Sequence, residues 1–148
     1  MTLNRAGTIL YVGTYQGLCV VDVEGCSLLA STQAVDLPQQ VVLSSDEESL
    51  YVHTSTDSGV TVLRTSDLSV TRRVNMGVFL AGHMALTPDG AYLYIGKAYE
   101  ATLIRDARSL LPVDSVALPG VGDLVFHPSG DTAYYASGSK LYVIGKRH

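Results

Sequence analysis

The sequence is short of several residue types, and each shortage narrows the range of functions. It has no tryptophan, two cysteines and only 16% charged residues, with a formal net charge of −4 over 148 residues. Phosphate binding needs clustered Lys and Arg, so this balance argues against a nucleic-acid partner. No apolar run reaches the roughly 18 residues that span a membrane, and the first residues lack the apolar core and cleavage site of a signal peptide. We expect a cytoplasmic protein with no nucleic-acid or membrane partner, although a processed chain of an exported protein would look the same.

The two cysteines, Cys19 and Cys26, are separated by six residues across an expected hairpin. Two ordinary thiols are favoured over a disulfide. A metal site is disfavoured, because the sequence has no second Cys pair and no suitably spaced His. Also absent are a Cys-x-x-Cys-His haem motif, a Gly-x-Ser-x-Gly nucleophile elbow and the glycine-rich phosphate loops. We therefore predict no metal and no cofactor.

The sequence does contain a recurring unit, best preserved from Thr87 to Asp106. Pro88-Asp89-Gly90 has the composition of a tight turn, because proline presets φ and glycine adopts conformations that other residues resist. The segments AYLYIGKA and ATLIRD follow with strand-like patterns, separated by Tyr99-Glu100, and a short apolar run precedes the turn. This pattern predicts an antiparallel meander of an inner strand, a Tyr-bearing second strand, a third strand and an outer strand.

Three other segments repeat this unit. They align on tyrosines of the second strand at intervals of 40, 43 and 40 residues: Tyr11, Tyr51, Tyr94 and Tyr134. A period near 40 with about four strands per repeat is typical of a β-propeller. We predict an all-β fold, a single partial β-propeller domain over 1–148 with antiparallel four-stranded blades, about three and a half to four per chain. The repeats cover approximately 4–38, 39–81, 82–121 and 122–148.

The second strands, YVGT, YVHT, YIGK and YYAS, resemble the YVTN family of β-propeller repeats, within the lactonase-like and amine-dehydrogenase-like propeller superfamily. The resemblance covers nearly the whole chain and implies the propeller fold. It implies little about function, because the family includes lactonase-like hydrolases, amine dehydrogenase subunits, haem-bearing nitrite reductases and binding proteins. The matching motif is structural, so the four tyrosines are interpreted as packing residues.

The first and last repeats are expected to be incomplete. Met1 to Arg5 is too short for an inner strand, and the last repeat stops before an outer strand, which leaves fourteen strands. An open arc of blades exposes unpaired strand edges and an apolar blade face. A second copy could complete the ring, which is the preferred interpretation. A different chain could also supply the missing part, the sequence could be a piece of a longer propeller, or a small four-bladed monomer could form.

Candidate site residues lie at the expected mouth of the central channel. Alignment by the turns places Gln40, His83 and Asp123 at the start of successive inner strands, and the neighbouring rim loops contribute Tyr15, Gln16, Asp57, Tyr99 and Glu100. A His and carboxylates around one mouth could perform acid–base chemistry or hold a divalent metal, and His83 and Asp123 are the candidate catalytic pair. Gln40, Tyr15, Tyr99 and Glu100 are candidate ligand-binding residues. The alternative is that inner-strand starts are polar because water fills the channel.

Two arginines, Arg64 and Arg105, are aligned at one otherwise apolar position of the third strand. They could bind a carboxylate of a ligand or partner, and they are included among the candidate ligand-binding residues. They could also pack their aliphatic stems between blades and carry their charge to water, which is preferred. His53 is interpreted as a hydrogen-bonded structural residue.

These patterns favour a binding or scaffold module that completes a ring by self-association or with a partner chain and binds a ligand or protein at the channel rim. The alternative is a small enzyme, a lactonase-like hydrolase or another acid–base catalyst, whose pocket forms only in the assembled propeller. Whether the chain is an enzyme is left open by the sequence.

Overall fold

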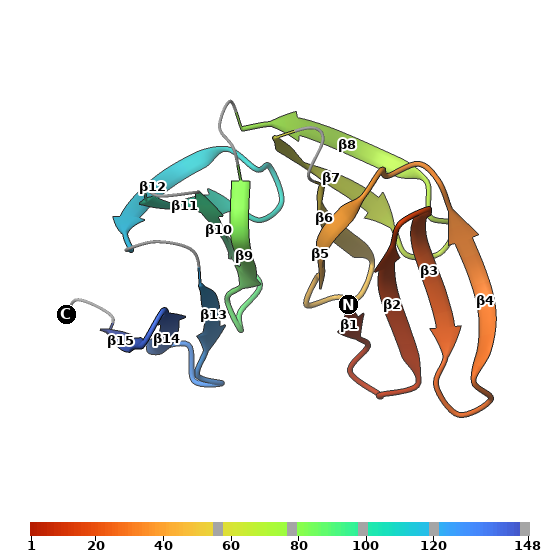
Figure 1. Ribbon diagram of the computed structural model, residues 1–148, viewed down its shortest axis with the longest axis horizontal. Coiled ribbons are helices and arrows are strands. Elements are labelled where there is room, and N and C mark those ends of the chain that lie inside the picture. Colours follow the sequence, from red (N-terminus) through yellow and green to blue (C-terminus); the bar gives the residue numbers. More distant parts are fainter. Residues whose placement is uncertain (55–57, 77–79, 98–100, 119–121, 146–148) are drawn as a thin grey trace. The chain divides into compact units, whose positions relative to one another are not determined.

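The computed structural model describes residues 1–54, 58–76, 80–97, 101–118 and 122–145. The chain divides into two compact units, unit 1 from Met1 to Val78 and unit 2 from Phe79 to His148. Every regular element in the described ranges is a β-strand, and consecutive strands form antiparallel sheets (Figure 1). Each unit holds two such sheets, which are called blades 1 to 4 in chain order. The prediction of an all-β propeller fold with antiparallel blades is confirmed.

Unit 1 contains two four-stranded blades, ordered from inner to outer strand as the chain runs. Blade 1 consists of β1 (Thr2–Leu3), β2 (Ile9–Thr14), β3 (Gly17–Asp22) and β4 (Ser27–Thr32). Blade 2 consists of β5 (Pro38–Leu43), β6 (Ser49–Thr54), β7 (Gly59–Arg64) and β8 (Val70–Asn75).

Unit 2 contains one four-stranded and one three-stranded blade. Blade 3 consists of β9 (Leu80–Leu86), β10 (Tyr92–Lys97), β11 (Ala101–Asp106) and β12 (Pro112–Ala117). Blade 4 consists of β13 (Asp123–Phe126), β14 (Thr132–Ser137) and β15 (Lys140–Gly145).

The start of the chain differs from the prediction, because blade 1 does have an inner strand. Thr2 pairs with Tyr11 and Leu3 with Leu10, so the two residues of β1 continue the sheet. The segment is long enough because the Asn4 side chain closes the turn: its Oδ1 accepts hydrogen bonds from the N–H groups of Thr8 and Ile9, at 2.8 and 3.0 Å. A ladder of two residue pairs then suffices for an inner strand.

The turn between inner and second strand is the same in all four blades. Its fourth residue has a left-handed φ of 62 to 76° and donates a backbone hydrogen bond of 2.8 to 3.0 Å to the carbonyl three residues earlier; these residues are Gly7, Glu47, Gly90 and Gly130. Glycine is favoured there because it lacks the Cβ that opposes positive φ. This shared turn gives a residue-by-residue alignment of the blades.

The core of unit 1 lies between its two blades. It is a cluster of nine buried side chains, contributed by both sheets and the connecting turns: Tyr11, Leu18, Val20, Val35, Val41, Leu50, Val52, Leu63 and Leu68. The core of unit 2 has four buried members, Leu118, Leu124, Ala133 and Tyr135, with partly buried side chains around them. The repeat tyrosines take part in this packing: Tyr11 belongs to the first cluster, and Tyr94 packs edge-on against Phe126 with ring centroids 5.0 Å apart.

Candidate functional site

His83, the predicted catalytic base, is buried in unit 2, with 4% of its surface exposed. Its Nδ1 lies 3.0 Å from the Gly122 carbonyl oxygen, and its Nε2 lies 3.1 Å from the Thr102 hydroxyl. The ring also packs edge-on against Tyr135, with centroids 5.2 Å apart. His83 on β9 thus contacts blade 4 through Gly122 and Tyr135. Both ring nitrogens have partners within the protein.

These contacts fix the state of the His83 ring. A carbonyl oxygen only accepts, so Nδ1 carries the proton and donates to Gly122, while Nε2 accepts from the Thr102 hydroxyl. Burial lowers the pKa of His83, and this effect outweighs the Gly122 hydrogen bond and the Asp123 charge, which raise it. The ring is therefore neutral at pH 7. A general base needs a lone pair directed at substrate, and in this arrangement the Nε2 lone pair is directed at Thr102.

Gln40 and Asp123 occupy equivalent places in their blades. Gln40 pairs with His53 and Asp123 pairs with Ala136, and each partner lies two residues after its repeat tyrosine. Asp123 is exposed, and its charge acts on the pKa of His83. The two predicted catalytic residues are thus neighbours in unit 2, whereas Gln40 belongs to unit 1. Their catalytic role stays a prediction.

Tyr15 and Gln16 are the other predicted rim residues that the structure describes. Tyr15 is 89% exposed at the turn between β2 and β3. Tyr99, Glu100 and Asp57 lie outside the described residues, so their predicted roles stay predictions.

Arg64 and Arg105 do not share a strand position, which corrects the alignment made from sequence. Arg105 pairs with Leu93, whereas Arg64 pairs with Ser49, one residue beyond the equivalent leucine. Arg64 corresponds instead to Asp106, because each accepts a backbone hydrogen bond from a turn leucine four residues later. The Arg64 guanidinium bonds Asp67 at 3.0 Å and Ser69 at 3.1 Å at the surface. Blade 2 reaches this turn one residue earlier than the sequence alignment assumed.

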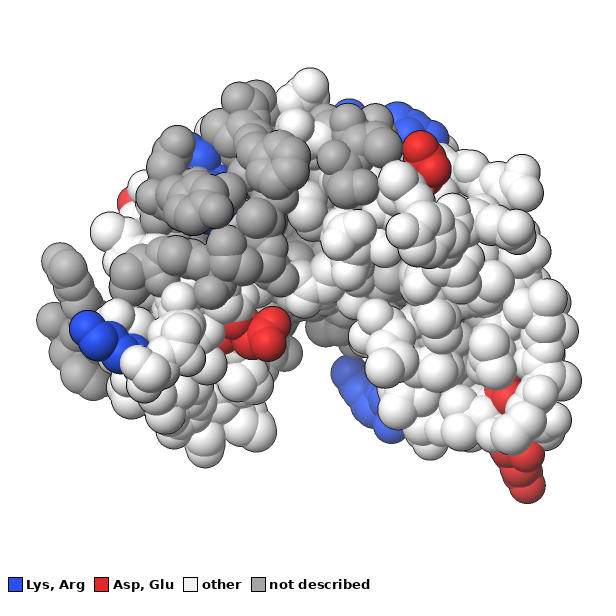
Figure 2. Space-filling view, viewed as in Figure 1, with Lys and Arg blue, Asp and Glu red and all other residues white. Residues whose placement is uncertain are grey.

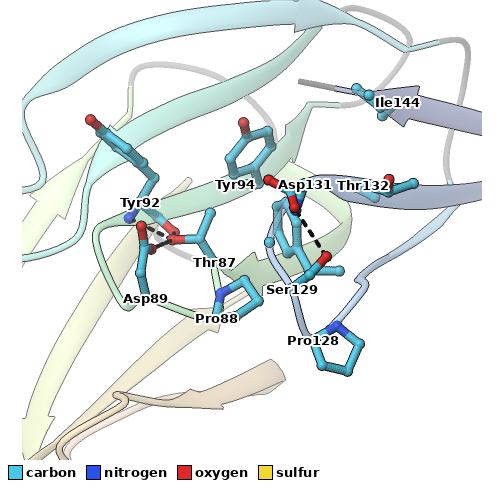
Figure 3. A pocket seen from close by; sticks show the side chains of 14 residues that line it. Thr87, Pro88, Asp89, Tyr92, Tyr94, Pro128, Ser129, Asp131, Thr132 and Ile144 are labelled. Carbon is cyan, nitrogen blue, oxygen red and sulfur yellow. Dashed lines mark hydrogen bonds between the residues drawn. The ribbon is translucent and has the colours of Figure 1, made fainter. Parts of the chain in front are cut away.

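A cavity lies on the opposite side of blades 3 and 4 from the predicted mouth, where the turns between inner and second strands meet. It has a volume of about 450 Å³ and is contained entirely in unit 2. One wall is the turn Thr87–Asp89 with Tyr92 and Tyr94 of β10, and the other is the turn Pro128–Asp131 with Ile144 of β15 (Figure 3). Phe126 and Ala133 complete the apolar part. The cavity is therefore a groove between blades 3 and 4.

Both walls of this groove are held by hydrogen bonds within the turns. The Thr87 hydroxyl donates to Asp89 Oδ1 at 2.6 Å, and it accepts from the Tyr92 N–H at 3.0 Å. Burial and, to a smaller degree, the negative charge of Asp114 and the Tyr92 hydroxyl raise the pKa of Tyr94. Tyr94 therefore stays protonated near neutral pH. The groove combines an apolar floor with a polar, acidic rim.

In unit 1 the apolar part of this groove is filled, and a cavity of about 450 Å³ there is lined by turn residues alone, Arg5, Ala6, Ser45, Asp46 and Glu47. There the corresponding turns meet through Arg5, whose guanidinium donates to the Ser45 carbonyl at 3.0 Å and whose N–H donates to the Glu47 carboxylate. Leu50 and Leu63, which are fully buried, occupy the places of Ala133 and Ile144. The smaller Ala133 side chain is one reason that unit 2 keeps a cavity where unit 1 has a packed core.

A second feature of blade 4 is its exposed apolar face. Val125, Tyr134 and Val143 form one cross-strand row, and Leu141 lies in the next row on the same face. Val125, Leu141 and Val143 are 58, 66 and 65% exposed. On the face of the molecule that Figure 2 shows, Lys, Arg, Asp and Glu side chains are scattered and form no broad charged patch. This set, Val125, Tyr134, Leu141 and Val143, is called the blade 4 face.

Blade 1 has a similar surface on the side away from blade 2. Leu3, Leu10, Val21 and Leu28 form one continuous cross-strand row over all four strands. Leu3 is 50% and Leu28 63% exposed, and Leu10 and Val21 are half-buried. This row is called the blade 1 face. The two faces are the surfaces that a neighbouring blade covers in a propeller.

No group of three or more His, Cys, Asp or Glu residues in the described part of the chain could hold a metal ion. Cys19 and Cys26 are free thiols. Among the described residues, no helix has the length and apolar character needed to cross a membrane.

Sequence reasoning missed the groove, whereas it expected an exposed apolar blade face at the ends of the arc without naming its residues. It assigned the PDG-type turns only a structural role and looked for function at the other ends of the strands. The signal was present in the sequence, because intact Pro-x-Gly turns occur at Pro88 and Pro128 in successive repeats. Equivalent turns of successive repeats lie on the same rim of a repeat protein, so this pattern could have indicated that the two turns are neighbours.

The chain resembles solved β-propellers in structure. It superposes on a structure of Kuenenia stuttgartiensis hydrazine synthase with a TM-score of 0.81 and 17% identity, covering 97% of this chain and 44% of the other. It superposes on the β-propeller domain of Myceliophthora thermophila Cps50 (Swd1) with a TM-score of 0.77 and 16% identity, covering 96% of this chain and 51% of the other. No family model and no curated protein sequence matches the chain. The similarity shows the fold, and the chain spans about half the length of these propellers.

Proposed function

We propose that the protein is a binding or scaffold module that completes a propeller ring by packing its blade 4 face against the blade 1 face of a second copy. The observation that carries the proposal is the exposure of Val125, Leu141 and Val143 on one side of a sheet. The other side of that sheet is packed in the core of unit 2. Water contact with such a continuous apolar surface costs free energy, roughly 25 cal/mol for each Å².

A second copy suits both faces at once. Two identical contacts, each between a blade 4 face and a blade 1 face, close a two-fold ring and cover the apolar ends of both chains. Each contact would have the same character as the core between blades 1 and 2, where aliphatic side chains and Tyr11 interdigitate. The assembled ring would then present its rim loops to a ligand or protein.

The test is the solution mass of the chain and of a face variant, measured by sedimentation equilibrium over a concentration series. We expect a species of twice the 15.8 kDa chain mass for the wild type. Val143→Asp places a charge in the middle of the contact and should give a monomer. The matched control is Val113→Asp on the outer strand of blade 3, where the side chain is 52% exposed outside both faces. A wild-type chain that stays monomeric at all concentrations, or a Val143→Asp variant that still associates, would contradict the proposal.

A further inference from the structure

The outer edge of blade 4 differs from that of the other blades. Blades 1, 2 and 3 each end in a fourth strand, β4, β8 and β12, whereas β15 pairs only with β14 in the described part of the chain. The outer strands of blades 2 and 3 carry residues that discourage further pairing, such as Arg72, Arg73 and Pro112. The sequence of β15, KLYVIG, has one charge, at its first residue, and otherwise reads as an interior strand.

The turn before an outer strand contributes a buried leucine in blades 2 and 3. Leu68 and Leu110 both have a φ of 57°, and both donate a backbone hydrogen bond to the residue that ends the third strand, at 2.9 and 2.8 Å. Their side chains are 5 and 2% exposed. A non-glycine residue at positive φ is strained, so the burial of its side chain has to offset that strain.

The position of Leu68 shows what the groove in unit 2 lacks. Leu68 belongs to the core cluster that contains Tyr11, Leu50 and Leu63. The equivalents of these three residues in unit 2 are Tyr94, Ala133 and Ile144, and all three line the groove of about 450 Å³. No described residue of blade 4 occupies the place of the turn leucine. The groove therefore lies where a leucine of a following turn packs in the complete blade.

We infer that the groove and the β15 edge together accept a β-strand from a partner polypeptide, whose leading turn inserts a leucine between blades 3 and 4. The strand would pair antiparallel with β15, as β8 pairs with β7. A second copy is a poor donor, because its own outer strands are each paired within their sheets. The partner that we infer is a polypeptide segment with a Ser- or Asp-rich turn, a leucine and an extended run, as in the turn and outer strand of blade 2. This inference rests on the proposed incompleteness of blade 4, but it concerns the edge of the sheet and not its face.

The experiment uses a probe peptide with the sequence of residues 64–75, RTSDLSVTRRVN, which contains the turn leucine and outer strand of blade 2. It is titrated into the full chain while the Ala133 and Ile144 methyl signals and the β15 amide signals are followed by NMR. We expect saturable shifts at these positions and slower amide exchange along β15. A peptide with aspartate in place of its leucine should bind at least about tenfold more weakly, since it has lost its apolar anchor.

Two protein variants separate groove filling from misfolding. Ala133→Leu places the blade 2 residue in the groove and should weaken peptide binding at least about tenfold while the chain remains folded. Ala136→Leu adds the same side chain on the opposite face of β14, where Ala136 is exposed, and should leave peptide binding unchanged. Unaltered binding to Ala133→Leu, or equal binding of the leucine and aspartate peptides, would overturn the inference.

The outcome is distinguishable from a failure of the proposed self-association. Val143→Asp should yield a monomer that still binds the peptide, because its side chain lies on the other face of β15 from Ile144. If Ala133→Leu instead abolishes self-association and the peptide causes no shifts, a second copy occupies the groove and the partner assignment is wrong.

Discussion

Unit 1 and unit 2 are built from the same repeat, yet among the described residues the buried cluster between the two blades is larger in unit 1 than in unit 2. Nine buried side chains join blades 1 and 2, whereas four form the core cluster of unit 2. At the rim, a hydrogen bond between Arg5 and Glu47 joins the two turns of unit 1. Pro88 and Gly130 occupy their places in unit 2, where a Cβ on Gly130 would lie 3.9 Å from Pro88. The shared repeat therefore determines the sheet of each blade. Whether two neighbouring blades pack fully depends on the sizes of a few side chains and on the presence of an outer strand.

The largest expected effect comes from giving unit 1 the small residue of unit 2. Leu50 is fully buried, so Leu50→Ala creates a cavity and should lower the free energy of unfolding by about 3 kcal/mol. The measurement is urea denaturation followed by circular dichroism. Val113→Ala, at a side chain that is 52% exposed and lies outside both apolar faces, is the control and should change this free energy by less than about 0.5 kcal/mol. A loss for Leu50→Ala as small as the control would show that the unit 1 core is not tightly packed.

A second substitution tests the contact that joins blades 3 and 4. A Cβ on Gly122 would lie 2.0 Å from the Ala136 carbonyl oxygen, so Gly122→Ala has to displace backbone and, with it, the hydrogen bond to His83. We expect a loss of about 2 kcal/mol in the free energy of unfolding, measured by urea denaturation. Gly145→Ala is the matched control, because nothing lies within 4 Å of its added Cβ. Equal stability of the two variants would show that blade 4 tolerates a shift at Gly122.

Filling the groove should make unit 2 resemble unit 1. Ala133→Leu introduces the residue found at the equivalent Leu50 and should raise the free energy of unfolding by about 1 kcal/mol. Ala136→Leu adds the same volume at an exposed position and should change stability by less than about 0.5 kcal/mol. A destabilised Ala133→Leu variant in thermal or urea unfolding would mean that the groove is too rigid to receive the side chain.

The smallest effect concerns pH. Burial lowers the pKa of His53 and His83 below the usual 6.5, so the unfolded chain binds protons that the folded chain does not. The two histidines contribute fully to stability above the pKa that they have in the unfolded chain. This contribution is lost as the pH falls from there through the lower pKa that they have in the folded chain. We expect the urea midpoint to fall between about pH 7.5 and about pH 5.5, and His83→Gln to flatten this dependence. An unchanged slope in the His83→Gln variant would show that folding does not lower the pKa of His83.

The repeat period and turn chemistry predicted most of the fold. Tyrosines spaced by about 40 residues and the turns before them located the second strand of every blade. The prediction failed at β1, because a two-residue strand has no pattern of its own and depends on the Asn4 turn. It also misaligned Arg64 with Arg105. The third strand of blade 2 ends one residue earlier than that alignment assumed, and this difference becomes clear only from the strand pairing.

The candidate site was less accessible to sequence reasoning. A polar residue at the start of an inner strand, such as His83, gives the same sequence pattern in two different environments. It can face a channel, or its ring can form hydrogen bonds with a backbone carbonyl and a hydroxyl group, as the His83 ring does. The groove depends on Ala133 being small where Leu50 is large and on the missing turn leucine, which are differences between repeats. An alignment made to find what the repeats share gives such differences little weight.

The most direct test of this account compares amide hydrogen exchange in β15 with exchange in the equivalent strand β7. The account treats β7 as the third of four strands over a filled core and β15 as an edge strand beside an open groove. It predicts that in the chain alone, at concentrations where it is monomeric, the amides of Leu141 to Ile144 exchange much faster than those of Val60 to Leu63. Equal protection of the two strands would contradict it, because blade 4 would then be as complete as blade 2.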